Sequence, residues 1–121
     1  MSVTVRITKS FGTAVKPLLK KYPSLKGDLL QLEKELIDEP KQGTSLGNNV
    51  YKIRLKISSK GRGKSGGARV ISLVEHMIIG ELQWDEEEVF VNLLTIYDKA
   101  ETANITDKEL KDLIKAFQSR G

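Results

Sequence analysis

Cysteine is absent from this sequence, and histidine occurs once, as His76. Without cysteine there is no disulfide framework and no thiolate metal site, and a single histidine leaves too few ligands for zinc. Long apolar runs are also missing. No stretch approaches the roughly 18 apolar residues of a membrane span, and the opening residues, Met-Ser-Val-Thr-Val-Arg, lack the apolar core of a signal peptide. We therefore expect no bound metal, no signal peptide and no membrane-spanning segment.

The composition is that of one globular domain. Of the 121 residues, 39% are hydrophobic and 30% are charged, which is typical of a soluble protein. A chain of this length buries roughly two-thirds of its extended surface on folding, so a hydrophobic core can form without disulfides. We expect residues 1–121 to form a single domain.

Basic side chains are concentrated in one segment, residues 50–70. This segment contains no acidic residue, whereas the rest of the chain carries 13 basic and 16 acidic residues. A basic patch on a slightly acidic body favours a polyanionic partner, nucleic acid first, although a solvated strand and loop is the alternative. The seven basic residues are Lys52, Arg54, Lys56, Lys60, Arg62, Lys64 and Arg69.

Apolar periodicity predicts the secondary structure. Strands are predicted at residues 3–8, 51–57, 68–74 and 89–97, the last as a central strand. Helices are predicted at residues 11–22, 25–36 and 107–117. Pro17 should kink or restart the first helix and Ser24 should cap the second, while Thr106 and Glu109 form a capping box that begins the third. Turn-forming residues predict loops at 41–49 and at the glycine-rich tip 58–67, and the acidic residues near 81–88 predict a solvated turn.

This order of elements, βααβββα, predicts an α+β fold. We expect a small, mainly antiparallel four-stranded sheet with two N-terminal helices and a C-terminal helix, the helices covering one face. In the strand at 51–57 the apolar and basic residues alternate, so Lys52, Arg54 and Lys56 should stand together on the other face.

Four segments of the sequence carry a resemblance to a known family. They are Gly43-Thr-Ser-Leu-Gly47 with Tyr51-Lys-Ile-Arg-Leu55, then Lys60-Gly-Arg-Gly-Lys-Ser-Gly-Gly-Ala-Arg-Val-Ile71, and finally Thr95-Ile-Tyr-Asp-Lys99 with Asn104-Ile-Thr106. In this order they resemble the RelE/ParE toxin superfamily, and most closely its HigB-type branch. The resemblance implies a RelE-like fold over residues 1–121.

The resemblance also implies a function. Such a protein is a cytoplasmic toxin of a type II toxin–antitoxin system, a ribosome-dependent endoribonuclease (mRNA interferase) that cleaves messenger RNA without a metal or other cofactor. Its partners are a helix-turn-helix antitoxin, the ribosome and mRNA, with no membrane. In this cleavage the 2′-hydroxyl attacks the adjacent phosphorus, so the protein must orient the RNA, stabilise negative charge and assist proton transfer.

Site residues follow from the resemblance position by position. Lys52, Arg54 and Arg69 are the expected catalytic cations, and Tyr97 and Lys99 could supply the groups that relatives place further on, where this chain has Ala100 and Thr106. Lys56, Lys60, Arg62 and Lys64 are expected to bind RNA phosphates. Each has a structural alternative: a solvated charge for Lys52 and Arg54, an ion pair for Arg69 and a core position for Tyr97.

Two other functions stay open at this point. A ParE-like poison of DNA gyrase would leave the Lys52, Arg54 and Arg69 cluster without a phosphate to bind. A non-catalytic RNA-binding module of RelE fold is suggested by Ala100 and Thr106, and by Ser72 and Leu73, which stand where close relatives often carry aromatic residues able to stack on a base.

Overall fold

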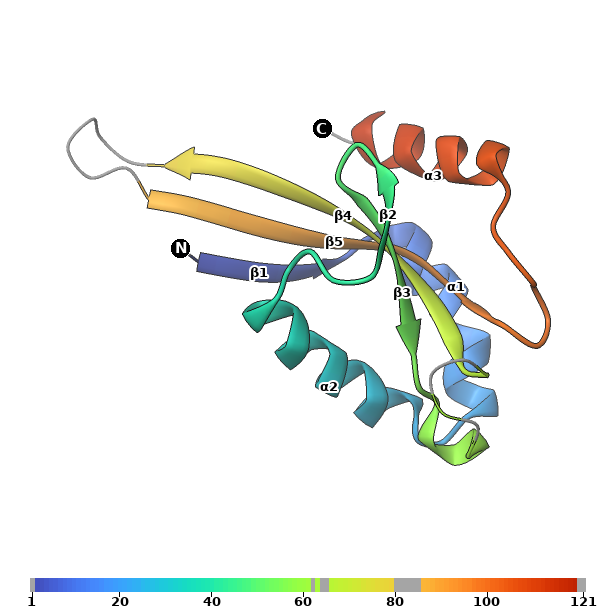
Figure 1. The fold of residues 1–121 in the computed structure, drawn as a ribbon. Helices are drawn as coiled ribbons and strands as arrows, with labels where there is room; N and C mark the ends of the chain where they lie inside the picture. Colours follow the sequence, from blue (N-terminus) through green and yellow to red (C-terminus); the bar gives the residue numbers. More distant parts are fainter. Residues whose placement is uncertain (1, 62, 64–65, 80–85, 120–121) are drawn as a thin grey trace.

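The chain forms a five-stranded sheet with helices on both faces, as a computed structural model shows (Figure 1). The structure describes residues 2–61, 63, 66–79 and 86–119. The elements in chain order are β1 (Ser2–Ile7), α1 (Lys9–Lys21), α2 (Leu25–Asp38), β2 (Thr44–Gly47), β3 (Val50–Leu55), the short 3₁₀ helix η1 (Ser58–Lys60), β4 (Ala68–Ile79), β5 (Glu86–Asp98) and α3 (Asp107–Ser119). The predicted α+β class is confirmed.

The sheet is mixed and has one strand more than predicted. Its order is β1-β5-β4-β3-β2, with β1 parallel to β5 and every other pair antiparallel. The extra strand, β2, lies in the segment predicted as a loop. It pairs with β3 through a two-residue turn in which Asn48 and Asn49 both have positive φ, 53° and 63°. That conformation belongs to a tight hairpin turn, so the polar residues that predicted a loop instead connect two strands.

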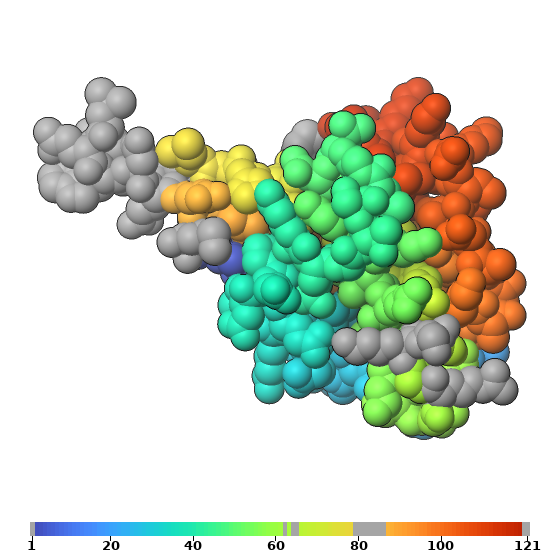
Figure 2. Space-filling model, viewed as in Figure 1, coloured from blue at the N-terminus to red at the C-terminus, as the bar shows by residue number. Residues whose placement is uncertain are grey.

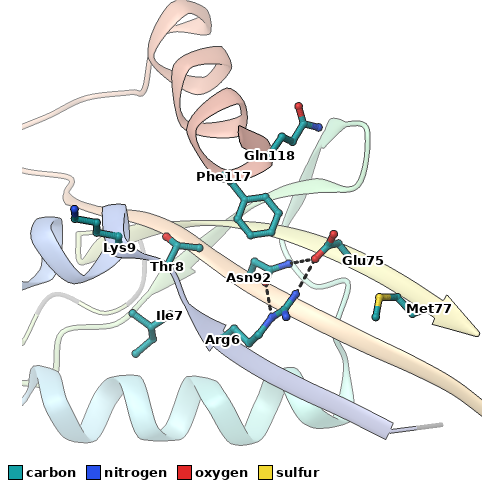
Figure 3. A pocket seen from close by; sticks show the side chains of 9 residues that line it. All are labelled: Arg6, Ile7, Thr8, Lys9, Glu75, Met77, Asn92, Phe117 and Gln118. Atoms are coloured by element: carbon teal, nitrogen blue, oxygen red, sulfur yellow. Dashed lines mark hydrogen bonds and ion pairs between the residues drawn. The ribbon is translucent and has the colours of Figure 1, made fainter. Parts of the chain in front are cut away.

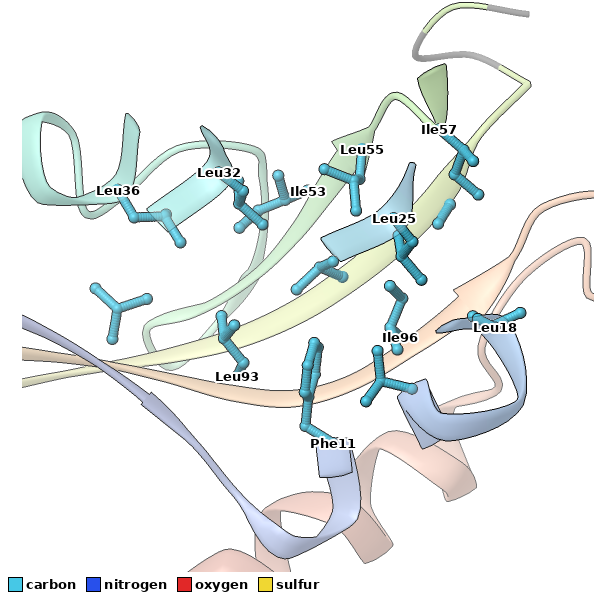
Figure 4. Packing of buried hydrophobic residues seen from close by; sticks show 14 of the residues in the cluster. Phe11, Leu18, Leu25, Leu32, Leu36, Ile53, Leu55, Ile57, Leu93 and Ile96 are labelled. Carbon is cyan, nitrogen blue, oxygen red and sulfur yellow. The ribbon is translucent and has the colours of Figure 1, made fainter. Parts of the chain in front are cut away.

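The main core lies between the sheet and the first two helices (Figure 4). Phe11, Val15 and Leu18 of α1 and Leu25, Leu32 and Leu36 of α2 are buried against Ile53, Val70, Val91 and Leu93 of the sheet. The helical spacing predicted these contacts. Pro17 is exposed within an uninterrupted α1, so the predicted restart of this helix is wrong. Ser24 occupies the predicted N-cap position of α2, but its hydroxyl donates to the Asp28 side chain and does not accept a hydrogen bond from a backbone amide of the helix.

The third helix covers the opposite face, which corrects the prediction that all helices share one face. Leu110, Ile114 and Phe117 of α3 pack on a second cluster formed by Val50, Ile71, Leu73 and Leu94. A bulge in the pairing of β4 with β5 at Ile71 and Ser72 contributes to this arrangement, because it brings Leu94 to the same side as Ile71. An apolar patch of this kind requires a cover, and α3 provides it.

The start of α3 agrees with its predicted capping box. The Glu109 amide donates to Thr106 Oγ1 over 3.1 Å, and the Thr106 amide donates to Glu109 Oε1 over 3.1 Å. These two hydrogen bonds satisfy amides that the first helical turn cannot pair by itself.

Strands β4 and β5 extend past the rest of the sheet as a hairpin arm (Figure 2). Their pairing runs from Ala68 opposite Asp98 to Ile79 opposite Glu86, whereas β1 reaches only to Glu88. The predicted strand at 68–74 is therefore too short. The predicted acidic turn is partly strand, because Glu86 begins β5, and its residues 81–85 lie outside the described residues. None of the described helices is long and apolar enough to cross a membrane.

Replacing Gly67 with alanine is expected to lower the free energy of unfolding by about 2 kcal/mol. A Cβ atom there would lie 2.0 Å from the backbone oxygen of Leu55, so the close approach of the two strand ends would have to open. Gly27 of α2 is the matched control, since a Cβ there meets no atom within 4 Å. Gly27→Ala should raise the free energy of unfolding by up to about 1 kcal/mol. Urea denaturation measures both, and equal stability of the two variants would contradict the steric argument.

Candidate functional site

Three of the predicted site residues form a row across the sheet. Arg54 of β3 pairs with Arg69 of β4, and Arg69 pairs with Tyr97 of β5. Paired residues of neighbouring strands point to the same face, so Arg54, Arg69 and Tyr97 lie side by side; we call them the cross-strand row. The face is the one that α3 covers, because Tyr97 packs on the second apolar cluster. Lys52 lies on the same face, two residues before Arg54 on β3, and it pairs with Ile71 of β4.

The row becomes more buried from its edge toward the sheet centre. Arg54 is exposed and Tyr97 is half-buried, whereas Arg69 is only 6% exposed. Arg69 Nη1 donates to the carbonyl of Ala68 over 3.1 Å. The guanidinium of Arg69 therefore has a fixed position, while the guanidinium of Arg54 can meet a ligand from solvent.

The Tyr97 hydroxyl is the least satisfied polar group of the row. Its oxygen is buried and makes no hydrogen bond within the described part of the chain. Burial raises the pKa of Tyr97, and this effect outweighs the positive charge of Arg69 and a backbone contact at Ile105, which lower it. The hydroxyl is thus protonated near neutral pH, so it can donate a proton or a hydrogen bond but is a poor general base.

A cavity of about 380 Å³ lies beside Tyr97, between β5 and α3. Thr95 and Tyr97 line it from the strand, and Thr102, Ile105, Glu109, Asp112, Leu113 and Ala116 line it from α3 and the segment before it. Two carboxylates therefore stand on the wall opposite Tyr97. This negative charge disfavours a phosphate inside the cavity while α3 stays in place.

Both candidate lysines are tied to the segment that connects β5 to α3. Lys52 Nζ donates to Asn104 Oδ1 over 3.2 Å, and Lys99 Nζ donates to the carbonyl of Ala103 over 2.7 Å. Lys52 lies on the face of the row, whereas Lys99 follows the end of β5. Lys52 thus lies on the face of the cross-strand row, whereas Lys99 makes a contact within the segment that connects β5 to α3.

The four predicted phosphate-binding residues do not form one outward group. Burial would raise the pKa of Asp28 on α2, but hydrogen bonds from Ser58 and Ser24 lower it, and the charge of the exposed Lys56 lowers it further. Lys60 points inward: its Nζ lies 2.7 Å from Asp98 Oδ1 and 3.1 Å from the carbonyl oxygen of Gly66. Lys60 is thereby engaged within the protein by Asp98 and Gly66, and its predicted contact with RNA phosphates stays a prediction. Arg62 and Lys64 lie outside the described residues.

Asp98 is a central residue that the sequence did not reveal. Its side chain is fully buried and accepts hydrogen bonds from Lys60 Nζ, from the Tyr22 hydroxyl over 2.5 Å and from the Ala100 amide over 3.0 Å. Burial by itself would raise the pKa of Asp98, but the hydrogen bonds from Lys60 and Tyr22 lower it to about 2. Asp98 directly follows Tyr97, so this cluster fixes the β5 end of the cross-strand row to α1 and η1. A carboxylate at the end of an apolar strand was the signal available in the sequence.

A second polar cluster lies on the same face, beside the other end of α3 (Figure 3). Arg6 of β1 donates to Asn92 Oδ1 over 2.9 Å and to Glu75 Oε1 over 2.8 Å, and its guanidinium stacks on the ring of Phe90. The buried Asn92 amide donates to Glu75 as well. A cavity of about 550 Å³ borders the cluster. Because Arg6 is neutralised by Glu75, the cluster fits a structural link between β1, β5 and β4 better than a phosphate site.

Within the described residues, no group of three or more His, Asp or Glu side chains could hold a metal ion. Comparisons with protein-family models, curated proteins and solved structures found no match to this chain.

Proposed function

We propose that this protein is the toxin of a type II toxin–antitoxin system, a metal-independent and ribosome-dependent endoribonuclease that cleaves mRNA. The proposal rests on the resemblance to the RelE/ParE superfamily and on one structural observation, the cross-strand row. Two arginines and a tyrosine are in register on three neighbouring strands, with Lys52 on the same face of the sheet. Such a set can bind a phosphate and stabilise charge that develops on it.

In the proposed reaction the residues of the row have different roles. Arg54, which is exposed, binds the scissile phosphate from solvent, and Arg69, which is fixed by its surroundings, stabilises the negative charge of the transition state. As the 2′-oxygen–phosphorus bond forms and the bond to the 5′-oxygen breaks, Tyr97, which its raised pKa keeps protonated, donates its proton to the leaving 5′-oxygen. The proton of the attacking 2′-hydroxyl passes to water, and Tyr97 regains a proton from solvent after the cleavage. Lys52 contributes a further positive charge at the edge of the site.

Partners follow from the same proposal. Lys56, together with Arg62 and Lys64, would bind RNA or ribosomal phosphates and make association salt-dependent. A helix-turn-helix antitoxin in the cytoplasm would neutralise the toxin, and an acidic segment of it would associate quickly with the basic face.

A second candidate is an RNA-binding module of the same fold without catalytic activity. The observation that favours it is the burial of Arg69 and of the Tyr97 hydroxyl, the latter beside the cavity that α3 lines. While these two groups stay buried, RNA reaches Arg54 and Lys56 but not the groups proposed for the chemistry.

Induced expression of the chain alone is expected to stop growth and translation, with cleavage of messages on the ribosome. Growth rate, amino-acid incorporation and mapping of RNA 5′ ends measure these effects. Arg54→Glu should restore growth, because it removes the proposed phosphate contact and adds repulsion. Lys34→Glu, a charge reversal on the exposed surface of α2, is the matched control and should stay toxic.

The other outcomes separate the alternatives. Normal growth and uncut messages with soluble, folded protein would contradict the nuclease and favour the binding module. DNA damage with intact messages would favour a gyrase poison instead.

A further inference from the structure

The hairpin arm leaves one edge of β4 without a neighbouring strand (Figure 1). Strand β3 pairs with β4 only from Ala68 to Leu73, so within the described residues no strand lies beside the outer edge of β4 beyond Val74. The uncovered segment comprises residues 75–79, and we call it the arm edge. An unpaired edge of this kind presents backbone donors and acceptors that can pair with another strand.

The backbone groups of His76 and Ile78 point outward from the arm edge. The Val74 amide donates to the carbonyl of Asn49 over 2.9 Å, so the backbone of Val74 faces the β3 side of the strand. Backbone groups alternate between the two edges of a strand, so those of His76 and Ile78 face the same side as those of Val74, whereas those of Met77 face β5. Because β3 has ended before this point, the N–H and C=O groups of His76 and Ile78 have no strand partner within the described residues.

The side chains of the arm edge favour association with another strand. Ile78 is 75% exposed and Met77 is 42% exposed. Residues 76–79 include no carboxylate, lysine or arginine, and the carboxylate of Glu75 is already hydrogen-bonded to Arg6. Natural edge strands usually carry lysine, proline or inward-pointing charges that oppose pairing with a second chain. The arm edge lacks this protection.

We propose that the arm edges of two copies of this chain pair antiparallel about a two-fold axis at Met77, which makes the protein a homodimer. In this register His76 of each copy lies opposite Ile78 of the other, and the outward N–H and C=O groups of both residues are all used. Met77 faces Met77 of the second copy on the side of the sheet that α3 covers. The Val74 amide stays bonded to Asn49, so the shared ladder ends at residue 75 of each copy.

A second copy fits this edge because the edge is complementary to itself. A two-fold contact places each residue opposite its own symmetry mate only on the axis, and there the residue is the uncharged Met77. The acidic residues of the arm, Glu86, Glu87 and Glu88, belong to β5. The two β5 strands of the dimer are three strand spacings apart, or about 14 Å. Salt screens charges at that separation, since the screening length is about 8 Å at physiological ionic strength.

The proposed dimer is independent of the RNA-directed function. Met77 and Arg69 are both on β4, about eight residues or roughly 26 Å apart along the strand. The shared ladder therefore leaves the cross-strand row uncovered, and failure of one proposal would not decide the other.

Sedimentation equilibrium of the complete chain measures the association. The ladder is short, so we expect a weak dimer with a dissociation constant of about 10–100 µM. Ile78→Pro should weaken the dimer by about tenfold or more, because proline lacks the N–H that faces the second copy while the bonds to β5 remain. Ile78→Lys should have a similar effect, since it places a charge on the edge. Leu30→Lys, at a 53% exposed position of α2, is the matched control and should leave the dimer unchanged.

Two charge variants at Met77 test the register itself. Met77→Glu and Met77→Lys should each be monomeric at about 100 µM, because like charges would lie directly opposite each other. An equimolar mixture of the two variants should form a heterodimer, which native mass spectrometry detects by its mass. A mixture that is no more dimeric than the separate variants would contradict a two-fold axis at Met77.

The absence of cysteine from the chain permits a crosslinking test. Met77→Cys introduces a single thiol, and residues that face each other in a non-hydrogen-bonded antiparallel pair have Cα atoms about 4.5 Å apart, which suits a disulfide. Mild oxidation should therefore convert Met77→Cys to a covalent dimer on non-reducing electrophoresis. Leu30→Cys is the control and should stay monomeric.

Three results would overturn the proposal. They are a chain that stays monomeric up to about 1 mM, a dimer that persists in both Ile78→Pro and Ile78→Lys, and crosslinking of Met77→Cys no faster than that of Leu30→Cys. A dimer that Leu30→Lys dissociates would assign self-association to the helical face instead. Circular dichroism of each variant verifies that the chain is folded, so a loss of association reports on the arm edge.

Discussion

Arg69→Ala is expected to slow single-turnover cleavage of ribosome-bound mRNA about 100- to 1,000-fold, if the proposed endoribonuclease function holds. The loss is large because Arg69 is almost completely buried, so its charge is placed before the RNA arrives and is little screened by water. Arg69→Lys should recover only part of the rate, since a lysine ammonium does not reproduce the planar guanidinium. Quench-flow at saturating protein measures the chemical step apart from binding.

The matched control for Arg69→Ala is Arg6→Ala on the same sheet. Arg6 also makes side-chain hydrogen bonds and contacts an aromatic ring, but it lies on β1, an edge strand that contributes no residue to the cross-strand row. Its replacement should leave the cleavage rate within about threefold of the original, because only stability is affected. An unchanged single-turnover rate in a folded Arg69→Ala variant would remove Arg69 from the proposed chemistry.

Asp98→Asn is expected to lower the free energy of unfolding by about 3 kcal/mol near neutral pH. The substitution leaves the ammonium of Lys60 next to a neutral amide in a site with little solvent access, and it weakens the hydrogen bond from Tyr22. Because the cluster joins α1, η1 and the end of β5, the effect should appear in global unfolding. Urea denaturation followed by circular dichroism measures it.

The same substitution predicts a specific pH dependence. The pKa of Asp98 is about 2 in the folded protein, below its ordinary value of 3.8. A lowered folded-state pKa means that the carboxylate stabilises the protein above about pH 4 and that this contribution is lost as the pH falls toward 2. The difference in stability between the original chain and Asp98→Asn should therefore be constant from pH 7 to about pH 5 and shrink below pH 4.

Glu101→Gln is the control for Asp98→Asn. Glu101 accepts a hydrogen bond from Lys21 over 2.8 Å, but both side chains are more than half exposed. Solvent screens such an exposed pair, so it contributes little to stability. A Glu101→Gln effect as large as that of Asp98→Asn would show that the cluster acts through general surface charge rather than through the buried carboxylate.

Local patterns in the sequence determined most of the elements of this protein. The alternation from Tyr51 to Ile57, the helical spacing of Leu25, Leu32 and Leu36, and the capping box at Thr106 each depend on residues a few positions apart. The physics of one strand or one helical turn decides such features, so they can be predicted without knowledge of the fold. The prediction that Arg54 shares a face with Lys52 rests on the same two-residue period.

Contacts between distant segments decided the rest. Residues Thr44–Gly47 form a strand because they pair with β3. Helix α3 packs on the second face because it buries the apolar side chains of Ile71, Leu73 and Leu94 there. Lys60 carries an ammonium group that could bind a phosphate, yet this group pairs with Asp98, which is 38 positions away in the sequence. Burial and pairing over such separations depend on how the sheet is assembled, and single-residue chemistry does not encode them.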